Sequence, residues 1–109
     1  MIVTCLTFEL KPGSFAALEE VFRRHRILER AIRVEGCQSL YLTANATHSG
    51  RAHVVGVWDD EVAYQRWLDH PERGVGTDDL LALMSDTWDP SAPGEVWNVL
   101  HPVEAAGRP

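Results

Sequence analysis

The order of extended and helical patterns along the chain is the feature that most limits its fold. Residues 2–10 alternate between polar and apolar side chains, as a half-buried β-strand does. Further extended patterns cover residues 37–45, 51–58 and 95–101. Helical patterns separate them, over Phe15–Val34, from Asp59 or Asp60 to Pro71, and from Thr77 to Trp88. The order β-α-β-β-α-α-β predicts an α+β fold, a ferredoxin-like unit with a four-stranded antiparallel sheet and one extra helix.

Local signals predict where these helices begin and end. Ser14 and Thr77 precede helical patterns and are the expected N-caps, as is Asp59 or Asp60 for the middle helix. Gly36 is expected to end the first helix, because glycine adopts the left-handed conformation that follows a last turn. The first helix is therefore expected to run unbroken almost to that glycine.

The predicted strands carry apolar side chains on both faces of the sheet. In the first strand, Leu6 and Phe8 alternate with Val3 and Cys5. The helices of such a fold cover only one face of an antiparallel sheet. We therefore expect a second copy of the chain to cover the other face, as a homodimer with twofold symmetry.

Length and charge exclude several classes of protein. The chain has 109 residues, which indicates one domain, placed at residues 1–102, and a flexible tail at residues 103–109. The net charge of -6 argues against a nucleic-acid partner. No run of about 18 apolar residues predicts a membrane span, and no secretory signal opens the sequence. We expect a cytoplasmic protein without a membrane partner.

The sequence predicts neither a cofactor nor a metal ion. Cys5 and Cys37 do not form a CxxC pair and are expected to be small buried side chains in strands. Gly74-Val75-Gly76 does not follow a strand, so it is no dinucleotide-binding fingerprint. No two histidines have the spacing of metal ligands on one helix face.

Large aromatic residues cluster where the third strand joins the middle helix. Trp58 ends the strand, and Tyr64 and Trp67 lie three residues apart on the helix, on one side of it. A helix this short needs fewer aromatics for packing alone. Each of the three therefore has two interpretations, a core side chain or the wall of a pocket for a flat apolar ligand.

Three segments together resemble the antibiotic biosynthesis monooxygenase family of the dimeric α+β barrel superfamily. They are Lys11–Gly13, Val34–Cys37 and Val57–Tyr64, and the resemblance extends over about residues 2–102. It implies the same ferredoxin-like fold, a dimer, and an aromatic-lined pocket between the sheet and the helices of each subunit. The superfamily includes several reaction types, so the fold alone does not name one.

The resemblance also suggests individual site residues. Trp58 and Tyr64 match a Trp and a Tyr associated with that pocket, whereas the family's Asn, four residues before the Trp, is Val54 here. A polar substitute from another strand remains open among Thr4, Thr7, Asn98 and His101. The catalytic candidates are His101, His70 and Tyr64. The substrate-binding candidates are Trp58, Tyr64, Trp67, Thr7 and Trp97, the last with the core or the dimer interface as alternatives.

The haem-degrading branch of the superfamily fits the sequence less well. Trp67 matches the Trp of that branch, but the position of the axial His holds Thr77, and the first strand has no Asn. We expect no haem, because the residue that would bind the iron is missing.

Three functions remain open. The first is a cofactor-independent monooxygenase acting on an electron-rich aromatic, such as a polyketide or a quinol. The second is a cyclase or isomerase that uses the same pocket without oxygen. The third is a dimer that binds a small molecule without catalysis, and the absence of the family's Asn at position 54 favours it.

Overall fold

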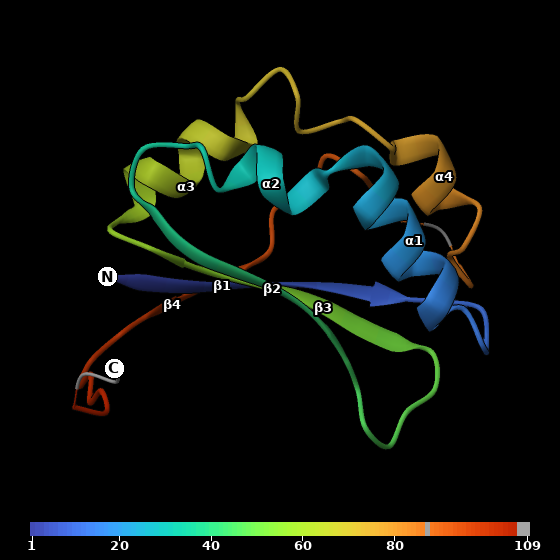
Figure 1. Ribbon diagram of the computed structural model, residues 1–109, viewed down its shortest axis with the longest axis horizontal. Helices are drawn as coiled ribbons and strands as arrows, with labels where there is room; N and C mark the ends of the chain where they lie inside the picture. Colours follow the sequence, from blue (N-terminus) through green and yellow to red (C-terminus); the bar gives the residue numbers. More distant parts are fainter. Residues whose placement is uncertain (87, 107–109) are drawn as a thin grey trace.

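The protein folds as a four-stranded antiparallel sheet with its helices on one face (Figure 1). The computed structural model describes residues 1–86 and 88–106. The elements in chain order are β1 (Ile2–Glu9), α1 (Phe15–His25), α2 (Ile27–Ala31), β2 (Cys37–Ala44), β3 (Arg51–Trp58), α3 (Glu61–Leu68), α4 (Thr77–Leu81) and β4 (Glu95–Asn98). The strand order β2-β3-β1-β4 is ferredoxin-like, which confirms the predicted fold class.

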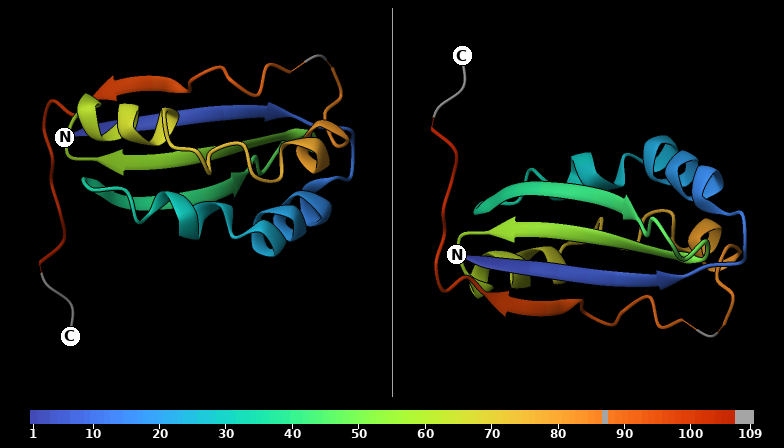
Figure 2. Two further views of the ribbon diagram at one scale, coloured as in Figure 1. Left: turned by 90° about the horizontal axis from the view of Figure 1, so that it is seen from above. Right: turned by 90° about the horizontal axis from the view of Figure 1, so that it is seen from below.

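Strand pairing fixes which side chains face the helices. In the β1–β3 register, Thr4 lies opposite Gly56 and Ile2 lies opposite Trp58. Alternate residues of a strand point to opposite faces, so Thr4, Phe8 and Trp58 are buried beneath the helices. Their neighbours point to the other face, which no helix covers in the described part of the chain (Figure 2, right).

The first helix is broken, and the prediction of one helix to Val34 was wrong. α1 ends at His25. The next residue, Arg26, has a φ of 53° in the left-handed region, and α2 begins at Ile27. The break lets α1 and α2 follow different directions over the sheet (Figure 1). Nothing in the sequence marks it, because left-handed residues are usually glycine or asparagine. Gly36 has a φ of 91° but lies in the turn before β2, five residues after α2 ends.

The ends of the later elements also differ from expectation. Of the two expected caps of α3, Asp59 and Asp60, the structure has Asp60, whose carboxylate accepts a hydrogen bond of 2.9 Å from the Ala63 N–H.

Thr77 is not the N-cap of α4, because its hydroxyl donates to the Gly74 carbonyl and Gly76 occupies the cap position. α4 ends at Leu81 rather than near Trp88. β4 is likewise shorter than the predicted 95–101, and Ser14 makes no side-chain cap bond.

The Asp60→Ala variant is expected to lose about 1 kcal/mol of folding free energy, because the Ala63 N–H loses its only side-chain cap. Urea denaturation followed by far-UV circular dichroism measures the loss. Asp59→Ala is the matched control, since that exposed carboxylate accepts from the Gln38 amide and caps nothing. Asp59→Ala should lose no more than about 0.5 kcal/mol of folding free energy. Equal losses in the two variants would contradict the capping role.

The core consists of two clusters that lie side by side under the helices. The larger includes Phe8, Leu18 and Phe22, between β1, α1 and α4. The smaller includes Trp58 and Tyr64, beneath α3. No helix in the described residues is long and apolar enough to cross a membrane. Residues 103–106 are exposed and have no regular secondary structure, and the rest of the expected tail, 107–109, lies outside the described residues.

Candidate functional site

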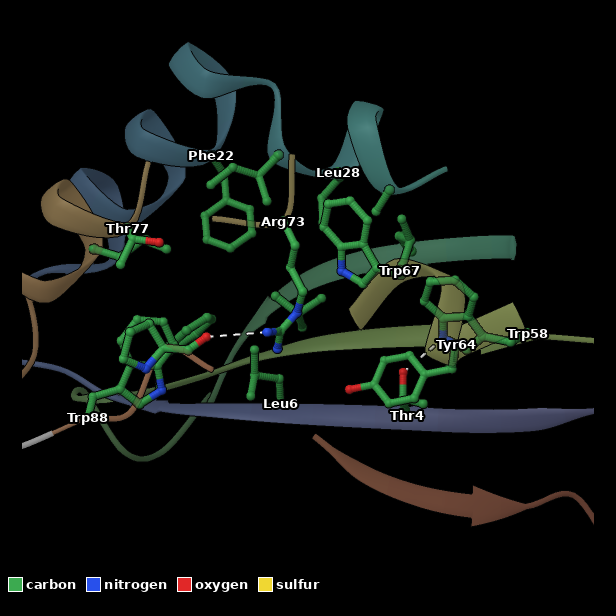
Figure 3. A pocket seen from close by; sticks show the side chains of 17 residues that line it. Thr4, Leu6, Phe22, Leu28, Trp58, Tyr64, Trp67, Arg73, Thr77 and Trp88 are labelled. Carbon is green, nitrogen blue, oxygen red and sulfur yellow. Dashed lines mark hydrogen bonds between the residues drawn. The ribbon is translucent and has the colours of Figure 1, made fainter. Parts of the chain in front are cut away.

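A cavity lies between the sheet and the helices, where the two core clusters meet (Figure 3). The volume open to the centre of a water molecule is about 80 Å³, several times what one water needs, roughly 10–15 Å³. Aromatic rings make up much of its wall: Phe8, Phe22, Trp58, Tyr64, Trp67 and Trp88. Such a mainly apolar hollow with few polar groups is typical of a small-molecule site.

Trp58 forms the floor of the cavity, and nearly all of its side chain is buried in the core. Its side chain is only 1% exposed, and its indole Nε1–H donates a 2.9 Å hydrogen bond to the Thr4 hydroxyl. The indole and the Thr4 hydroxyl can lie this close to β3 because residue 56 is a glycine. A Cβ added to Gly56 would lie 2.6 Å from the indole Nε1 and 2.9 Å from the Thr4 oxygen. Trp58 therefore serves chiefly to hold the cavity open and to position its neighbours.

Tyr64 links helix α3 to the segment that precedes β4. Its ring packs on Trp58 with centroids 5.3 Å apart, and its hydroxyl oxygen accepts a 2.8 Å hydrogen bond from the Gly94 N–H. A tyrosine hydroxyl can donate its own proton while it accepts another. Tyr64 thus presents a hydroxyl group at the side of the cavity, next to the Thr4 end of the floor (Figure 3).

Arg73 brings a positive charge to the cavity. It comes from the loop after α3, and its guanidinium lies between Trp67 and Trp88, over Leu6 (Figure 3). Its Nη2 donates to the Ala92 carbonyl at 3.0 Å, and its Nη1 donates to the Pro90 carbonyl at 3.4 Å. Arg73 was not predicted to lie here, because a glycine-containing loop carries no periodic pattern that orients its side chains.

The structure brings only some of the predicted site residues together. Trp58, Tyr64 and Trp67 line the cavity, and so does Val54 at the position of the family's asparagine. His70 does not line it; its ring lies 5.7 Å from that of Trp67, and its Nδ1 accepts a hydrogen bond from the Glu72 N–H.

The other three candidates lie away from the cavity. Thr7 is on the helix-free face of the sheet, with its hydroxyl 3.0 Å from His53 Nδ1. Trp97 is opposite Val3 on the same face and is 57% exposed. His101 follows β4 and is exposed. The alternation of strand residues places Thr7 and Trp97 on the helix-free face, and this alternation is visible in the sequence. The path of the chain after β4, which places His101, is not visible in the sequence.

Cys37 is unsuited to act as a nucleophile. It packs beside the cluster that contains Trp58, and burial raises the pKa of its thiol to about 11. The reactive form of cysteine is the thiolate, which is scarce at neutral pH when the pKa is that high. The described residues also contain no group of three or more His, Cys, Asp and Glu side chains that could hold a metal ion.

Comparison with known proteins places the chain in a family. The family model described as "Antibiotic biosynthesis monooxygenase" matches residues 1–75. A solved structure of a protein from Nitrosomonas europaea, provisionally given that name, has 17% identity and a TM-score of 0.72, over 93% of this chain and all of the other. A protein from Deinococcus radiodurans with the same provisional name has 17% identity and a TM-score of 0.73, over 98% of this chain and all of the other.

A haem-degrading protein from Mycobacterium tuberculosis is also similar, with 19% identity and a TM-score of 0.62, over 94% of this chain and 98% of the other. Identities this low show a common fold and leave the reaction open. No curated protein matches the sequence. Since the family model covers well over half of the chain, the chain belongs to the antibiotic biosynthesis monooxygenase family.

Proposed function

We propose that this protein is a cofactor-independent monooxygenase that oxidises an electron-rich aromatic small molecule, of the polyketide or quinol type. The observation that carries the proposal is the cavity itself, an apolar space walled by aromatic rings in a member of this family. Flat rings pack well against Trp67 and Trp88, and a cavity of this kind excludes water from the reacting carbon.

In the proposed reaction the substrate supplies the electrons. A methylene carbon next to a phenol or ketone loses a proton, and the resulting carbanion transfers electrons to O₂. One oxygen atom enters the product as a carbonyl, and the other leaves as water with the two hydrogens of the methylene: R₂CH₂ + O₂ → R₂C=O + H₂O. The protein has to favour the anion and keep bulk water away from it.

Tyr64 is the catalytic candidate that the cavity supports. Its hydroxyl can donate a hydrogen bond to the substrate oxygen on which negative charge develops, while the Gly94 N–H holds that hydroxyl in place. His70 and His101 have no part in this proposal, because neither lines the cavity. Both hydrogens of the substrate methylene leave in the water that forms from the second oxygen atom.

Oxygen uptake tests the proposed reaction. The purified protein should consume one O₂ per anthrone converted to anthraquinone, without added cofactor, as measured with an oxygen electrode and by absorbance. Tyr64→Phe should lower kcat by about 10- to 100-fold, the effect of losing one hydrogen bond to a developing anion. No oxygen uptake with a panel of anthrones and quinols would refute the proposal.

One observation favours a second candidate, a non-oxidative role. The Thr4, Tyr64, Arg73 and Thr77 side chains at the cavity all bond to other parts of the protein. None of the described residues that line the cavity is a carboxylate or a histidine. A site without a base suits binding alone. Turnover of a polyketide-like compound without oxygen would instead indicate a cyclase or isomerase.

We also propose that two copies of the chain pack through their helix-free sheet faces. This face carries Val3, Val55 and Val57 in its centre and the large exposed side chains of Tyr41 and Trp97 nearer its edges. Exposed apolar area of this extent commonly marks an interface. The continuous row of apolar side chains matches an identical face better than it matches a charged partner, which favours a second copy of the chain.

Trp97→Glu is expected to convert the dimer to a monomer, because a buried charge replaces a large aromatic contact at a cost of about 2 kcal/mol or more. Sedimentation velocity measures the change. Val62→Glu is the matched control, since Val62 is 59% exposed on α3, much as Trp97 is 57% exposed on β4. A monomer in the unmodified protein, or dissociation by both variants alike, would contradict this interface.

A further inference from the structure

Arg73 is a charged side chain in an otherwise largely apolar cavity. Its half-buried guanidinium shares the cavity wall with Leu6, Trp67 and Trp88. Within the described residues, no carboxylate oxygen lies within 4.0 Å of it, although four other arginines, Arg23, Arg24, Arg30 and Arg51, have such a partner. A charge that is partly removed from water without an opposite charge is unfavourable. The cavity thus carries a positive charge without a carboxylate partner among the described residues.

The guanidinium also keeps hydrogen-bonding capacity for a ligand. An arginine has five N–H donors, and among the described residues the Arg73 guanidinium donates to two carbonyls, those of Pro90 and Ala92. These carbonyls lie on the loop that also supplies Trp88 and Pro90 to the cavity wall. They fix the position of the guanidinium without neutralising it, because a carbonyl is polar but uncharged.

Two acidic side chains, one in the residue before Arg73 and one on the loop that Arg73 contacts, make bonds to other groups. The carboxylate of Glu72, the preceding residue, pairs with Arg30 at 2.8 Å. Asp89, on the loop, accepts hydrogen bonds from the Ser91 N–H at 2.9 Å and the Ser91 hydroxyl at 2.7 Å. These bonds, with a smaller contribution from the charge of Arg73, hold the pKa of Asp89 below its usual range, and its side chain is exposed to solvent.

We propose that Arg73 determines specificity by pairing with a carboxylate on an aromatic ligand. The planar guanidinium matches a carboxylate in shape and charge, and the flanking indoles of Trp67 and Trp88 offer faces for the attached rings. The preferred ligand is thus an aromatic that carries a carboxylate, which is expected to bind more tightly than a neutral aromatic of the same shape. The inference rests on the pocket of the proposed function, but it concerns binding and is independent of whether O₂ is used.

Two probes that differ only in charge test the inference. 2-Naphthoate and 2-naphthamide share their rings and their shape, and binding to the intact protein is measured by quenching of tryptophan fluorescence and by calorimetry. Naphthoate is expected to bind about 10- to 100-fold more tightly than naphthamide, the gain from hydrogen bonds to a charged group. In Arg73→Gln this preference should vanish, so that the ratio of the two affinities falls to about one.

Arg66→Gln is the matched control. Its guanidinium also donates to a main-chain carbonyl, that of Glu35 at 3.1 Å, but it is exposed on α3 and outside the cavity. It should keep the full preference for naphthoate. Arg73→Lys covers the case in which Arg73→Gln fails to fold, since it keeps the charge and should retain a reduced preference.

Equal affinities for the two probes in the unmodified protein would overturn the inference. So would a preference for naphthoate that survives in Arg73→Gln, or a loss of both ligands in that variant while it remains folded. These results would leave oxygen uptake with neutral anthrones unaffected, so failure here and failure of the proposed oxidation are separable.

Discussion

Trp58→Ala is expected to lose about 3–5 kcal/mol of folding free energy. The Trp58 side chain is 1% exposed, packs on Tyr64, and spans the floor of the cavity. Removing the indole creates a large void that the sheet cannot close, because β3 is paired on both sides. A small domain has a total stability of about 5–15 kcal/mol, so the variant should be partly unfolded near physiological temperature.

Denaturant titration followed by far-UV circular dichroism measures this loss. Thr4→Val tests the hydrogen bond between Trp58 and Thr4 alone, because valine keeps the side-chain shape and leaves the indole N–H without its acceptor. This variant is expected to lose about 1–3 kcal/mol of folding free energy. The loss of folding free energy in Trp58→Phe should lie between the losses in Thr4→Val and Trp58→Ala. A loss below about 1 kcal/mol in Trp58→Ala would show that the residue is a dispensable wall of the cavity and not part of the core.

The strands were predictable because their patterns are local. Alternation alone placed β3 at 51–58 as observed and put Trp58 at its end. The Asp60 cap followed from the same reasoning, since a carboxylate before a helical pattern satisfies exposed N–H groups. The aromatic cluster was predictable as well, because Tyr64 and Trp67 lie on one side of a short helix and both reach the cavity.

The sequence did not predict what depends on chain paths without a repeating pattern. Arg26 breaks the first helix although neither glycine nor proline is near it. Arg73 and Trp88 reach the cavity from loops, where no periodicity orients side chains. His70 and His101 lie at the ends of elements, where the mouth of a pocket usually forms. Proximity to an end does not determine toward which face of the sheet a residue turns.

Gly36 does not end a helix as expected, because α2 ends five residues earlier at Ala31. Its φ of 91° still favours glycine in the turn before β2. Its second role lies in packing, which the sequence does not reveal. A Cβ built on Gly36 would lie 2.6 Å from the Cβ of Ala63, a residue with no exposed surface. The turn before β2 therefore packs against α3 at this point, one residue before Tyr64.

Gly36→Ala is expected to lose about 2–5 kcal/mol of folding free energy, the combined effect of an unfavourable φ and of overpacking. The double variant Gly36→Ala/Ala63→Gly separates the two causes in the same denaturant titration. It removes the clash but keeps the backbone strain, so its loss should be about 1–3 kcal/mol smaller than the sum of the single losses. If the losses of the two single variants simply add in the double variant, the added methyl group of residue 36 does not clash with α3. If the contact also positions Tyr64, the single variant should weaken 2-naphthamide binding, and the double variant should restore it.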